Sequence, residues 1–299
     1  MDEARVREVL QGLPGFEGYD GPLERMDGLT NAVFRAGGAV VRLPGKGTED
    51  YIDRANEAVA AREAARAEVS PEVLFVNPAT GVMVTRYIAD TVTMTPDAFR
   101  TRPGAPARAG AAFRQLHGSG VVFPARFELF AMIDDYLRVL ATKDVALPTG
   151  YHDVVAEAGA VRAVLDAAPV APVPCHCDPL CENFLDTGTR MWIVDWEYSG
   201  MNDPMWDLGD LSVEGAFDPD QDAAMLHAYF GGPPPAQDRA RMTVHKAMCD
   251  LLWTLWGLIQ LANENPADDF RVYADTRFAR CKALMASDDF ARQVAVLRA

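Results

Sequence analysis

The sequence predicts an α+β fold of two lobes, with a small antiparallel sheet in the N-terminal lobe and mostly helices in the larger C-terminal lobe. Two observations predict this fold. Up to Tyr87, short apolar runs alternate with turn signals, whereas after Tyr87 apolar residues recur at helical spacing. With 299 residues, 49% of them hydrophobic, the chain is long enough to bury a core in each lobe. We expect the lobes to span residues 1–88 and 89–299.

Short strands and one helix are predicted in the first lobe. Ala32–Arg35 and Ala39–Leu43 are apolar runs joined by Gly37-Gly38, which predicts a hairpin. Arg54–Glu68 is rich in Ala, Glu and Arg and contains no Gly or Pro, so it predicts a helix. Two further predicted strands, separated by an Asn-Pro-Ala-Thr-Gly turn, are Val73–Val76 and Val82–Ile88.

Helical periodicity dominates the second lobe. A predicted hairpin around residues 173–195 interrupts the helices, and the run Gly231–Pro235 predicts a break between two of them. The predicted helices are Ala107–His117, Ala131–Thr142, Val154–Ala167, Met205–Glu214, Ala240–Ala262 and Phe270–Ala286. We expect the chain to pass from one lobe to the other near residues 85–95.

Charge and composition narrow the function classes. The formal net charge is −15, which disfavours nucleic acid and anionic membranes as partners, because both require a basic surface. A small cationic substrate suits such a protein. The N-terminal stretch lacks the apolar core of a signal peptide, and the apolar run Leu251–Leu261 is too short to span a bilayer. The five cysteines, an odd number in a large chain, favour reduced thiols in a cytoplasmic protein.

The most informative segment is residues 173–197. It holds His176, Asp178 and Asn183 in the pattern H-x-D-x4-N, and Asp195 follows twelve residues after Asn183 at the end of an apolar run. This spacing is typical of a phosphoryl-transfer loop. A carboxylate within reach of an acceptor hydroxyl takes its proton, which makes Asp178 the candidate catalytic base. Asn183 and Asp195 offer the hard oxygen ligands that Mg²⁺ prefers, and His176 is expected to brace the loop.

The first lobe contains candidate nucleotide-binding residues. Arg42 lies near the end of a predicted strand, where a kinase needs a cation for the phosphates, and Glu57 lies in the next helix, where an acid holds that cation. The segment Met83–Ile88, with Thr85 and Tyr87, is expected to form a sheet edge that binds adenine through its backbone. The residues expected to cover the phosphates with backbone N–H groups are Gly28, Leu29, Thr30 and Asn31.

Two tryptophans and an acid form a candidate substrate site. Asp207 and Asp210 fall in the predicted helix Met205–Glu214, and Glu214 lies four residues after Asp210 on the same face. Trp253 and Trp256 are three residues apart and also share one face of their predicted helix. Ring faces attract a cation and a carboxylate balances its charge, which suits an ammonium group. Periodicity alone favours a simpler alternative, in which both tryptophans pack in the core.

These residues resemble the choline/ethanolamine kinase family, a branch of the aminoglycoside-phosphotransferase-like kinases. The resemblance covers about residues 24–260. Its most specific parts are Ile193–Ser199, which reads Ile-Val-Asp-Trp-Glu-Tyr-Ser, and the helix with Trp253-x-x-Trp256-Gly257. A departure is Pro179, which follows Asp178 where the family usually has another residue. The other matching segments are Gly28–Asn31, Val41–Gly45, Ile52–Glu57 and His176–Asn183.

The resemblance implies a two-lobed protein-kinase-like fold of the bacterial type. It implies ATP with Mg²⁺ as the phosphate donor and a small cationic amino alcohol as the acceptor, with choline converted to phosphocholine as the leading case. It implies Asp178 as the base, with Asn183 and Asp195 at the metal. The residues that it suggests around the substrate ammonium are Glu197, Glu214, Trp253 and Trp256, with Tyr198 and Phe217 as further aromatic candidates. The sequence leaves the oligomeric state open, a homodimer included.

Alternatives to this interpretation stay open. A kinase of the same fold could act on ethanolamine, an aminoglycoside, thiamine or another small hydroxyl compound. Cys175, Cys177 and Cys181 surround His176, and thiolates with imidazole bind zinc, although the spacing is awkward for a structural zinc site. A kinase-like protein that binds without catalysis is the third alternative.

Overall fold

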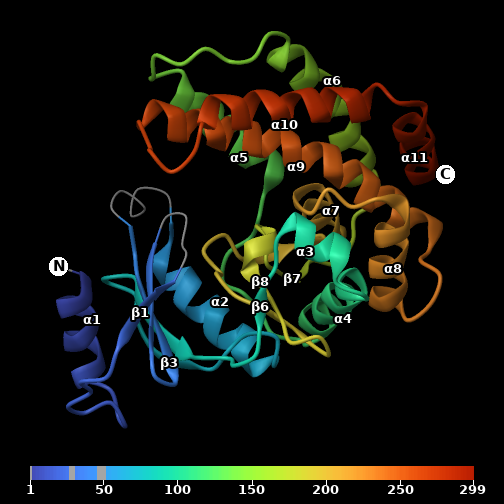
Figure 1. Cartoon of the computed structure of the whole chain (residues 1–299). Coiled ribbons are helices and arrows are strands. Elements are labelled where there is room, and N and C mark those ends of the chain that lie inside the picture. Colours follow the sequence, from blue (N-terminus) through green and yellow to red (C-terminus); the bar gives the residue numbers. More distant parts are fainter. Residues whose placement is uncertain (1, 27–30, 46–51) are drawn as a thin grey trace.

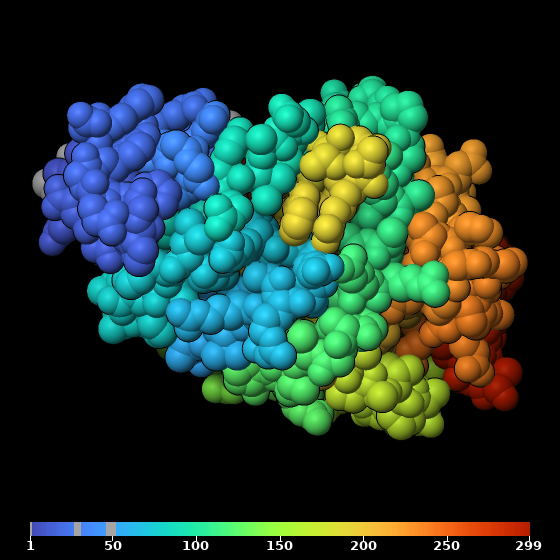
Figure 2. Space-filling model, turned by 90° about the horizontal axis from the view of Figure 1, so that it is seen from below, coloured from blue at the N-terminus to red at the C-terminus, as the bar shows by residue number. Residues whose placement is uncertain are grey.

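The computed structural model describes residues 2–26, 31–45 and 52–299. It has a sheet-rich N-terminal lobe beside a larger helical lobe, as predicted (Figure 1). Figure 2 shows another face, on which the first residues of the chain and the last ones lie at opposite ends. The predicted phosphate-covering residues Gly28, Leu29 and Thr30 lie outside the described residues.

An antiparallel sheet with the strand order β1-β2-β3-β5-β4 forms the N-terminal lobe. Val84 packs with α1 (Asp2–Gln11) on one face of this sheet. Met83, which points the other way along the same strand, packs in the cluster that contains α2 (Arg54–Arg66). The sheet therefore lies between the two helices. The strands are β1 (Leu23–Met26), β2 (Ala32–Ala36), β3 (Ala39–Leu43), β4 (Val73–Asn77) and β5 (Val82–Arg86).

The prediction that Met83–Ile88 forms a sheet edge is wrong. β5 pairs with β3 on one side and with β4 on the other, so the backbone at Thr85 is already part of two ladders. The Tyr87 N–H donates to the Gly38 carbonyl at 2.9 Å. The hairpin partner β4 takes the outer position, a choice that alternation of apolar residues does not reveal.

Helix α9 (Ala236–Ala262) is the centre of the C-terminal lobe, where it packs against α10, α7, α5 and α11. Figure 1 shows α9 and α10 side by side. Within the described residues, no helix combines the length and apolar character that crossing a bilayer requires. The other elements are β6 (Val92–Thr93), α3 (Pro96–Thr101), α4 (Ala105–His117), α5 (Leu129–Leu140), α6 (Tyr151–Ala167), β7 (Val173–Cys175), the 3₁₀ turn η2 (Cys181–Asn183), β8 (Phe184–Asp186), β9 (Met191–Ile193), β10 (Gly200–Asn202), α7 (Pro204–Glu214), α8 (Pro219–Phe230), α10 (Phe270–Met285) and α11 (Asp288–Arg298).

Helices α1, α3, α8 and α11 are absent from the sequence-based prediction. The start of α8 could nevertheless have been predicted from the sequence, because Asp218 and Gln221 form a reciprocal capping box and Pro219 lies at the first helical position. Thr95 caps α3 and Ser287 caps α11 by a single hydrogen bond each, which the hydroxyl accepts from a backbone N–H of the first turn. Cap residues were therefore a signal that periodicity alone missed.

Candidate active site

The predicted catalytic loop joins β7 to the hairpin of β8 and β9. The hairpin pairs Phe184 with Ile193, and just beyond this pair the Val194 N–H donates to the Asn183 carbonyl at 2.9 Å. This pairing brings Asp195 close to Asn183 in space. Asp195 has a φ of 68°, a left-handed conformation that residues other than glycine seldom adopt, so surrounding contacts hold the backbone there.

A buried carboxylate on α7 supports the loop. Asp207 accepts the His176 N–H at 2.7 Å and the Cys177 N–H at 2.8 Å, and His117 Nε2 lies 3.1 Å from the same carboxylate. The Trp206 indole N–H donates to the Cys177 carbonyl at 3.0 Å. Asp207 thus satisfies two loop amides at once, a role that the sequence analysis missed although it had located Asp207 on the predicted helix.

His176 is fully buried and connects the catalytic loop to the segment that follows β9. Its Nε2 lies 2.9 Å from the Val194 carbonyl, and its ring packs edge-on against Trp196. Burial lowers the pKa of His176, which favours the neutral ring. These contacts fit a brace of the loop backbone.

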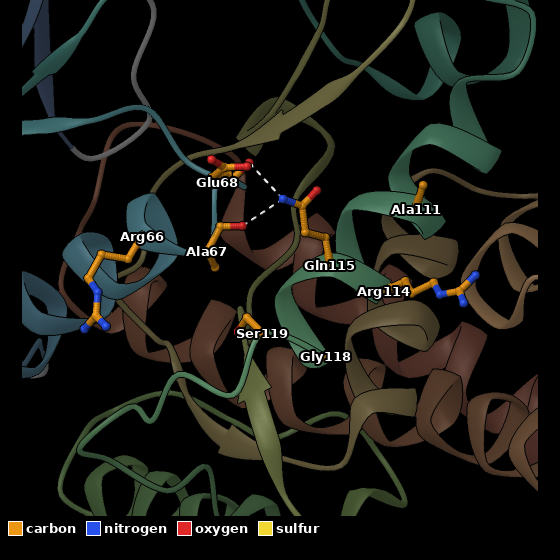
Figure 3. Close-up of a pocket in the computed structure, with 8 residues that line it drawn as sticks. All are labelled: Arg66, Ala67, Glu68, Ala111, Arg114, Gln115, Gly118 and Ser119. Carbon is orange, nitrogen blue, oxygen red and sulfur yellow. Dashed lines mark hydrogen bonds between the residues drawn. The ribbon is translucent and has the colours of Figure 1, made fainter.

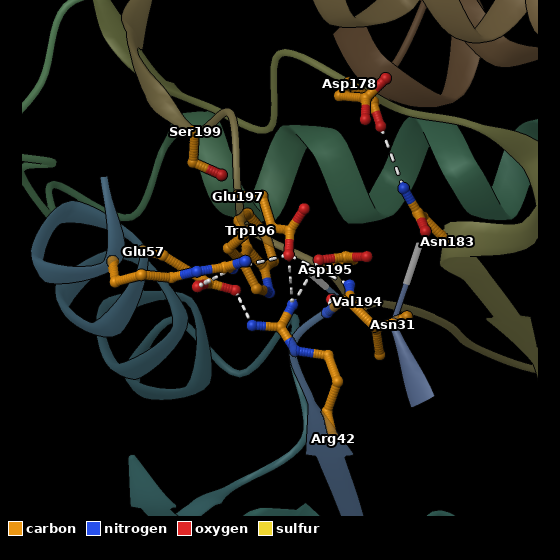
Figure 4. Close-up of polar contacts among 12 residues, drawn as sticks. Asn31, Arg42, Glu57, Asp178, Asn183, Val194, Asp195, Trp196, Glu197 and Ser199 are labelled. Carbon is orange, nitrogen blue, oxygen red and sulfur yellow. Dashed lines mark hydrogen bonds and ion pairs between the residues drawn. The ribbon is translucent and has the colours of Figure 1, made fainter. Parts of the chain in front are cut away.

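Asp178 and Asn183 face the same side of the loop (Figure 4). The Asn183 side-chain N–H donates to the backbone carbonyl of Asp178 at 3.1 Å, which leaves the Asn183 amide oxygen for another partner. Burial raises the pKa of Asp178 well above its usual range, and repulsion from Glu214 and Asp195 adds to that effect. A carboxylate with a raised pKa is a stronger base, as proton removal from a hydroxyl requires.

A network of ion pairs, which we call the inter-lobe cluster, consists of Arg42, Arg54, Glu57, Asp195 and Glu197 (Figure 4). Arg42, from β3, pairs with Glu57 of α2, with Asp195 at 2.7 Å and with Glu197 at 3.3 Å. Arg54 bonds Glu57 at 2.8 Å and Glu197 at 2.7 Å. The predicted Arg42–Glu57 pair is therefore present, and it extends into the loop after β9.

Glu197 was expected beside the substrate ammonium, but the structure places it in the inter-lobe cluster. Its carboxylate contacts Arg42, Arg54 and the Asn31 amide, the last at 3.1 Å. Burial would raise the pKa of Glu197, but the two guanidinium groups outweigh it and hold that pKa below its usual value. Asn31 also accepts the Gly45 N–H at 3.2 Å, so it links the end of β3 to the cluster.

Three carboxylates of this cluster form a donor set for a metal ion. Ligand oxygens of Glu57, Asp195 and Glu197 lie within 4.8 Å of one another. Asp195 is the most exposed, with a side chain that is 33% accessible. Burial raises its pKa to about 7, with a further contribution from Glu197 that Arg42 opposes. An all-oxygen set that holds excess negative charge suits a hard divalent cation such as Mg²⁺.

Four aromatic rings from three segments form what we call the aromatic cluster: Tyr198, Trp253, Trp256 and Tyr273. The Trp253 ring meets Tyr198 at 5.4 Å and Trp256 at 6.5 Å between centroids, and Trp256 meets Tyr273 at 5.7 Å. The Trp256 indole N–H donates to the Tyr198 hydroxyl at 3.0 Å. Gly257 permits the approach of α10, because a Cβ there would lie 2.6 Å from Tyr273 Cδ1. Sequence reasoning missed Tyr273.

Charged side chains border these rings. Glu214 pairs with Arg277, and Arg277 also bonds Asp250 at 3.2 Å while its guanidinium carbon lies 4.6 Å from the centroid of Tyr273. Arg280 holds Asp250 through two hydrogen bonds of 2.5 and 2.6 Å. Asp210 accepts the Trp253 indole N–H at 3.2 Å. Glu214 therefore lies in the same region as the two tryptophans, as predicted, but its carboxylate already pairs with Arg277.

Other predicted residues lie elsewhere. Phe217 packs against Phe99, with 5.2 Å between ring centroids, and lies beside a different core cluster from the two tryptophans, so its position does not support the suggested cage role. The thiol of Cys175 donates to the backbone carbonyls of Asn202 and Asp203, each at 3.7 Å. Besides the three carboxylates, one other group of possible metal ligands is found among the described residues, namely His117, Cys175 and Asp207. Neither group contains Cys177 or Cys181, so the structure does not support the predicted zinc site of three cysteines around His176.

A surface hollow of about 660 Å³ lies where the end of α2 meets α4 (Figure 3). Gln115 crosses it and donates to the carbonyl of Ala67 at 2.8 Å. None of the residues that line it belongs to the catalytic loop or to either cluster. We therefore place the active site at the loop and the two clusters, where chemically suited groups converge, and not at this hollow.

Comparison with known proteins agrees with this geometry. A phosphotransferase enzyme family model matches residues 24–245, more than half of the chain. A crystal structure of a choline/ethanolamine kinase family protein from Mesorhizobium loti has 68% sequence identity and a TM-score of 0.93, with 100% of this chain and 99% of that chain covered. The chain belongs to the choline/ethanolamine kinase family. The kinase is therefore an enzyme that phosphorylates an alcohol group, and the predicted family and fold are confirmed.

More distant relatives share the architecture of the kinase. Protein LicA of Haemophilus influenzae is 25% identical over 268 residues, which cover 85% of the kinase and 76% of LicA. The structure of choline kinase LicA from Streptococcus pneumoniae is 24% identical with a TM-score of 0.80, and the match covers 95% of the kinase and 99% of that chain. LicA has also been solved in complex with AMP, at 24% identity and a TM-score of 0.74, with 89% of the kinase and 91% of that chain covered. These structures share its two-lobed fold.

Proposed function

We propose that this kinase transfers the γ-phosphoryl group of ATP to the hydroxyl of choline. The observation that carries the proposal is the aromatic cluster, in which Tyr198, Trp253, Trp256 and Tyr273 meet. Asp178 lies close enough to Tyr273 and Glu214 to interact electrostatically with both. Electron-rich ring faces attract a quaternary ammonium group, which cannot form N–H hydrogen bonds. The name of the Streptococcus pneumoniae relative, a choline kinase, supports the same acceptor.

Asp178 acts as the base in this proposal. Its carboxylate takes the proton of the choline hydroxyl as the oxygen forms a bond to the γ-phosphorus and the bond between that phosphorus and the bridging oxygen of ADP breaks. The raised pKa of Asp178, caused first by burial, makes it a better proton acceptor than an exposed aspartate. Asp207 keeps Asp178 in position because it binds the two amides that precede it, those of His176 and Cys177.

The inter-lobe cluster binds the phosphates in this proposal. Asp195 and the Asn183 amide oxygen would hold Mg²⁺, beside the carboxylates of Glu57 and Glu197. The ion would neutralise charge on the phosphate oxygens. Arg42 supplies a fixed positive charge, and Asn31 holds the chain after β3 against the cluster. The AMP complex of LicA supports a nucleotide in this fold.

Adenine binding is proposed for the chain that follows β5. The backbone of β5 is occupied on both sides, so Thr85 can contribute only its side chain. Tyr87 and the residues after it leave the sheet at the junction of the lobes, where a base could insert beside the phosphates.

A panel of acceptors tests the function. ADP formation would be measured with ATP and Mg²⁺ on choline, ethanolamine, dimethylethanolamine, thiamine and kanamycin, with Asp178→Asn protein as the matched control. We expect the highest kcat/KM for choline and a turnover lower by at least about a hundredfold in the control. A higher kcat/KM for another acceptor would assign the loop to that acceptor, and silence with every acceptor would contradict the proposal.

A further inference from the structure

The side chain of Asn56 joins the N-terminal lobe to two segments of the C-terminal lobe. Asn56 lies in the first turn of α2, directly before Glu57, and it is only 6% exposed. Its Nδ2 donates to the Ser199 carbonyl at 2.8 Å, and its Oδ1 accepts the Ala125 N–H at 3.1 Å. Both ends of the amide therefore bond backbone groups of the C-terminal lobe, so this side chain ties α2 to that lobe.

The two backbone groups that bond Asn56 lie at the end of a short parallel pairing. The Met201 N–H donates to the Ala125 carbonyl at 2.8 Å, and the Phe127 N–H donates to the Met201 carbonyl at 3.2 Å. The next bond of a regular parallel ladder would join the Ala125 N–H directly to the Ser199 carbonyl. The Asn56 amide is inserted between these groups, which it can bridge because it offers a donor and an acceptor.

Ser199 connects this bridge to the catalytic machinery. It lies two residues after Glu197, on the segment that carries two acids of the inter-lobe cluster (Figure 4). Its hydroxyl donates to the His176 carbonyl at 3.3 Å, at the start of the catalytic loop. Asn56 precedes the third acid, Glu57, so one amide spans from the helix of that acid to the segment of the other two.

We propose that Asn56 is a positioning residue for the carboxylates of Glu57, Asp195 and Glu197. Its amide holds α2 at a fixed distance from the segment after β9, which keeps ligand oxygens of the three acids within 4.8 Å of one another. Groups that hold metal ligands in place contribute about tenfold to a hundredfold to metal affinity. The inference rests on the proposed use of ATP with Mg²⁺, but not on the identity of the acceptor.

The test compares Asn56→Leu, which removes both bonds with a side chain of similar shape, with Tyr151→Phe as the control. Tyr151 donates to the Leu251 carbonyl at 2.6 Å in the core around α9, so its variant also loses a buried bond to the backbone. Both variants should lower the Tm. Only Asn56→Leu should raise, by about tenfold or more, the Mg²⁺ concentration that gives half-maximal ADP formation. The KM for the acceptor should stay within about twofold in both.

Two measurements do not depend on turnover. Titration calorimetry with Mg²⁺ and a non-hydrolysable ATP analogue should show the same loss of affinity in Asn56→Leu. In the enzyme without ligands, amide hydrogen exchange should become faster in Asn56→Leu in the first turn of α2 and in residues 125–127 and 199–201. Tyr151→Phe should leave exchange in these segments as in wild type. A fall in Tm with unchanged metal affinity would make Asn56 a structural residue and overturn the proposal.

A second variant covers the case in which Asn56→Leu does not fold. Asn56→Ala leaves room for a water molecule between the two backbone groups, so it should fold more readily and show a smaller loss of metal affinity. Affinity equal to that of wild type in Asn56→Ala, with exchange also unchanged, would overturn the role of Asn56. Wild-type enzyme that bound neither Mg²⁺ nor the ATP analogue would instead contradict the proposed function itself.

Discussion

The inter-lobe cluster and the surroundings of the aromatic cluster each contain two arginines and three acids, but the carboxylates pair with the arginines differently. Arg42 and Arg54 face Glu57, Asp195 and Glu197, while two arginines of α10 face three acids of α7 and α9. In the inter-lobe cluster every carboxylate contacts a guanidinium. Beside the aromatic cluster, Asp210 accepts an indole N–H and makes no ion pair with any residue that the structure describes.

This difference follows from what each region is proposed to bind. Phosphates carry negative charge, so the first region needs protein cations in place before a nucleotide arrives, with a metal added alongside. An ammonium group brings its own positive charge, so the second region needs no further protein cation beside its acids. Each of the following changes affects one of the two regions and tests what it binds.

The largest effect is expected at the base between the two regions. Asp178→Asn should reduce kcat by about a hundredfold to ten-thousandfold, the usual contribution of a general base. Binding of an ATP analogue and the Tm should change little, because the backbone carbonyl that accepts from Asn183 is retained. Single-turnover kinetics and nucleotide titration would measure both. Activity within tenfold of wild type would rule Asp178 out as the base.

The next largest effect concerns the inter-lobe cluster. Arg42→Met removes the shared partner of Glu57 and Asp195. Because the Arg42 side chain is only 12% exposed, the loss leaves buried carboxylates unpaired, and the free energy of unfolding should fall by about 3–5 kcal/mol. The KM for ATP should rise as well. Chemical denaturation and steady-state kinetics would measure the two effects.

A matched control for this change is available on the surface. Arg86 pairs with Glu72, and both side chains are more than half exposed, at 56% and 60%. Arg86→Met should therefore change the stability by less than about 1 kcal/mol. Equal losses in the two variants would show that Arg42 has no special part in the fold.

A smaller effect is expected in the aromatic cluster. Trp253→Ala should raise the KM for choline about thirtyfold, since a desolvated cation–π contact contributes about 2 kcal/mol. The KM for ATP should rise much less. Trp192→Ala serves as the control, because that ring stacks under Arg190 and lies outside the aromatic cluster. If the KM for choline stayed constant in Trp253→Ala, the tryptophan would belong to the core alone.

The smallest effect is a pH dependence of metal binding. Burial raises the pKa of Asp195 to about 7, and a carboxylate must lose its proton before it binds Mg²⁺. Below that pH, protons compete with the metal, so the affinity should fall by about tenfold per pH unit and level off above it. Titration calorimetry with Mg²⁺ would measure this trend. A constant affinity on both sides of about pH 7 would indicate that Asp195 is no ligand.

The sequence by itself determined the local parts of this protein. The strands flanking Gly37-Gly38, the helix after Asp53 and the loop from His176 to Asn183 depend on caps, turns and spacings of a few residues. Such signals act between neighbours, so a single sequence displays them. The candidate base, the histidine expected to brace its loop and the two proposed oxygen ligands were predicted in this manner.

Only the tertiary structure decided which distant groups meet. Arg42 contacts Asp195 across 153 positions, Glu197 turns toward Arg42 and Arg54, and β4 takes the outer place in the sheet. Periodicity shows that a helix has two faces but not what each face touches, so the partners of Glu214 and Asp210 could not be read from spacing. The physical reason is that the packing of α7, α9 and α10 sets the neighbours, and therefore the charge balance, of each carboxylate.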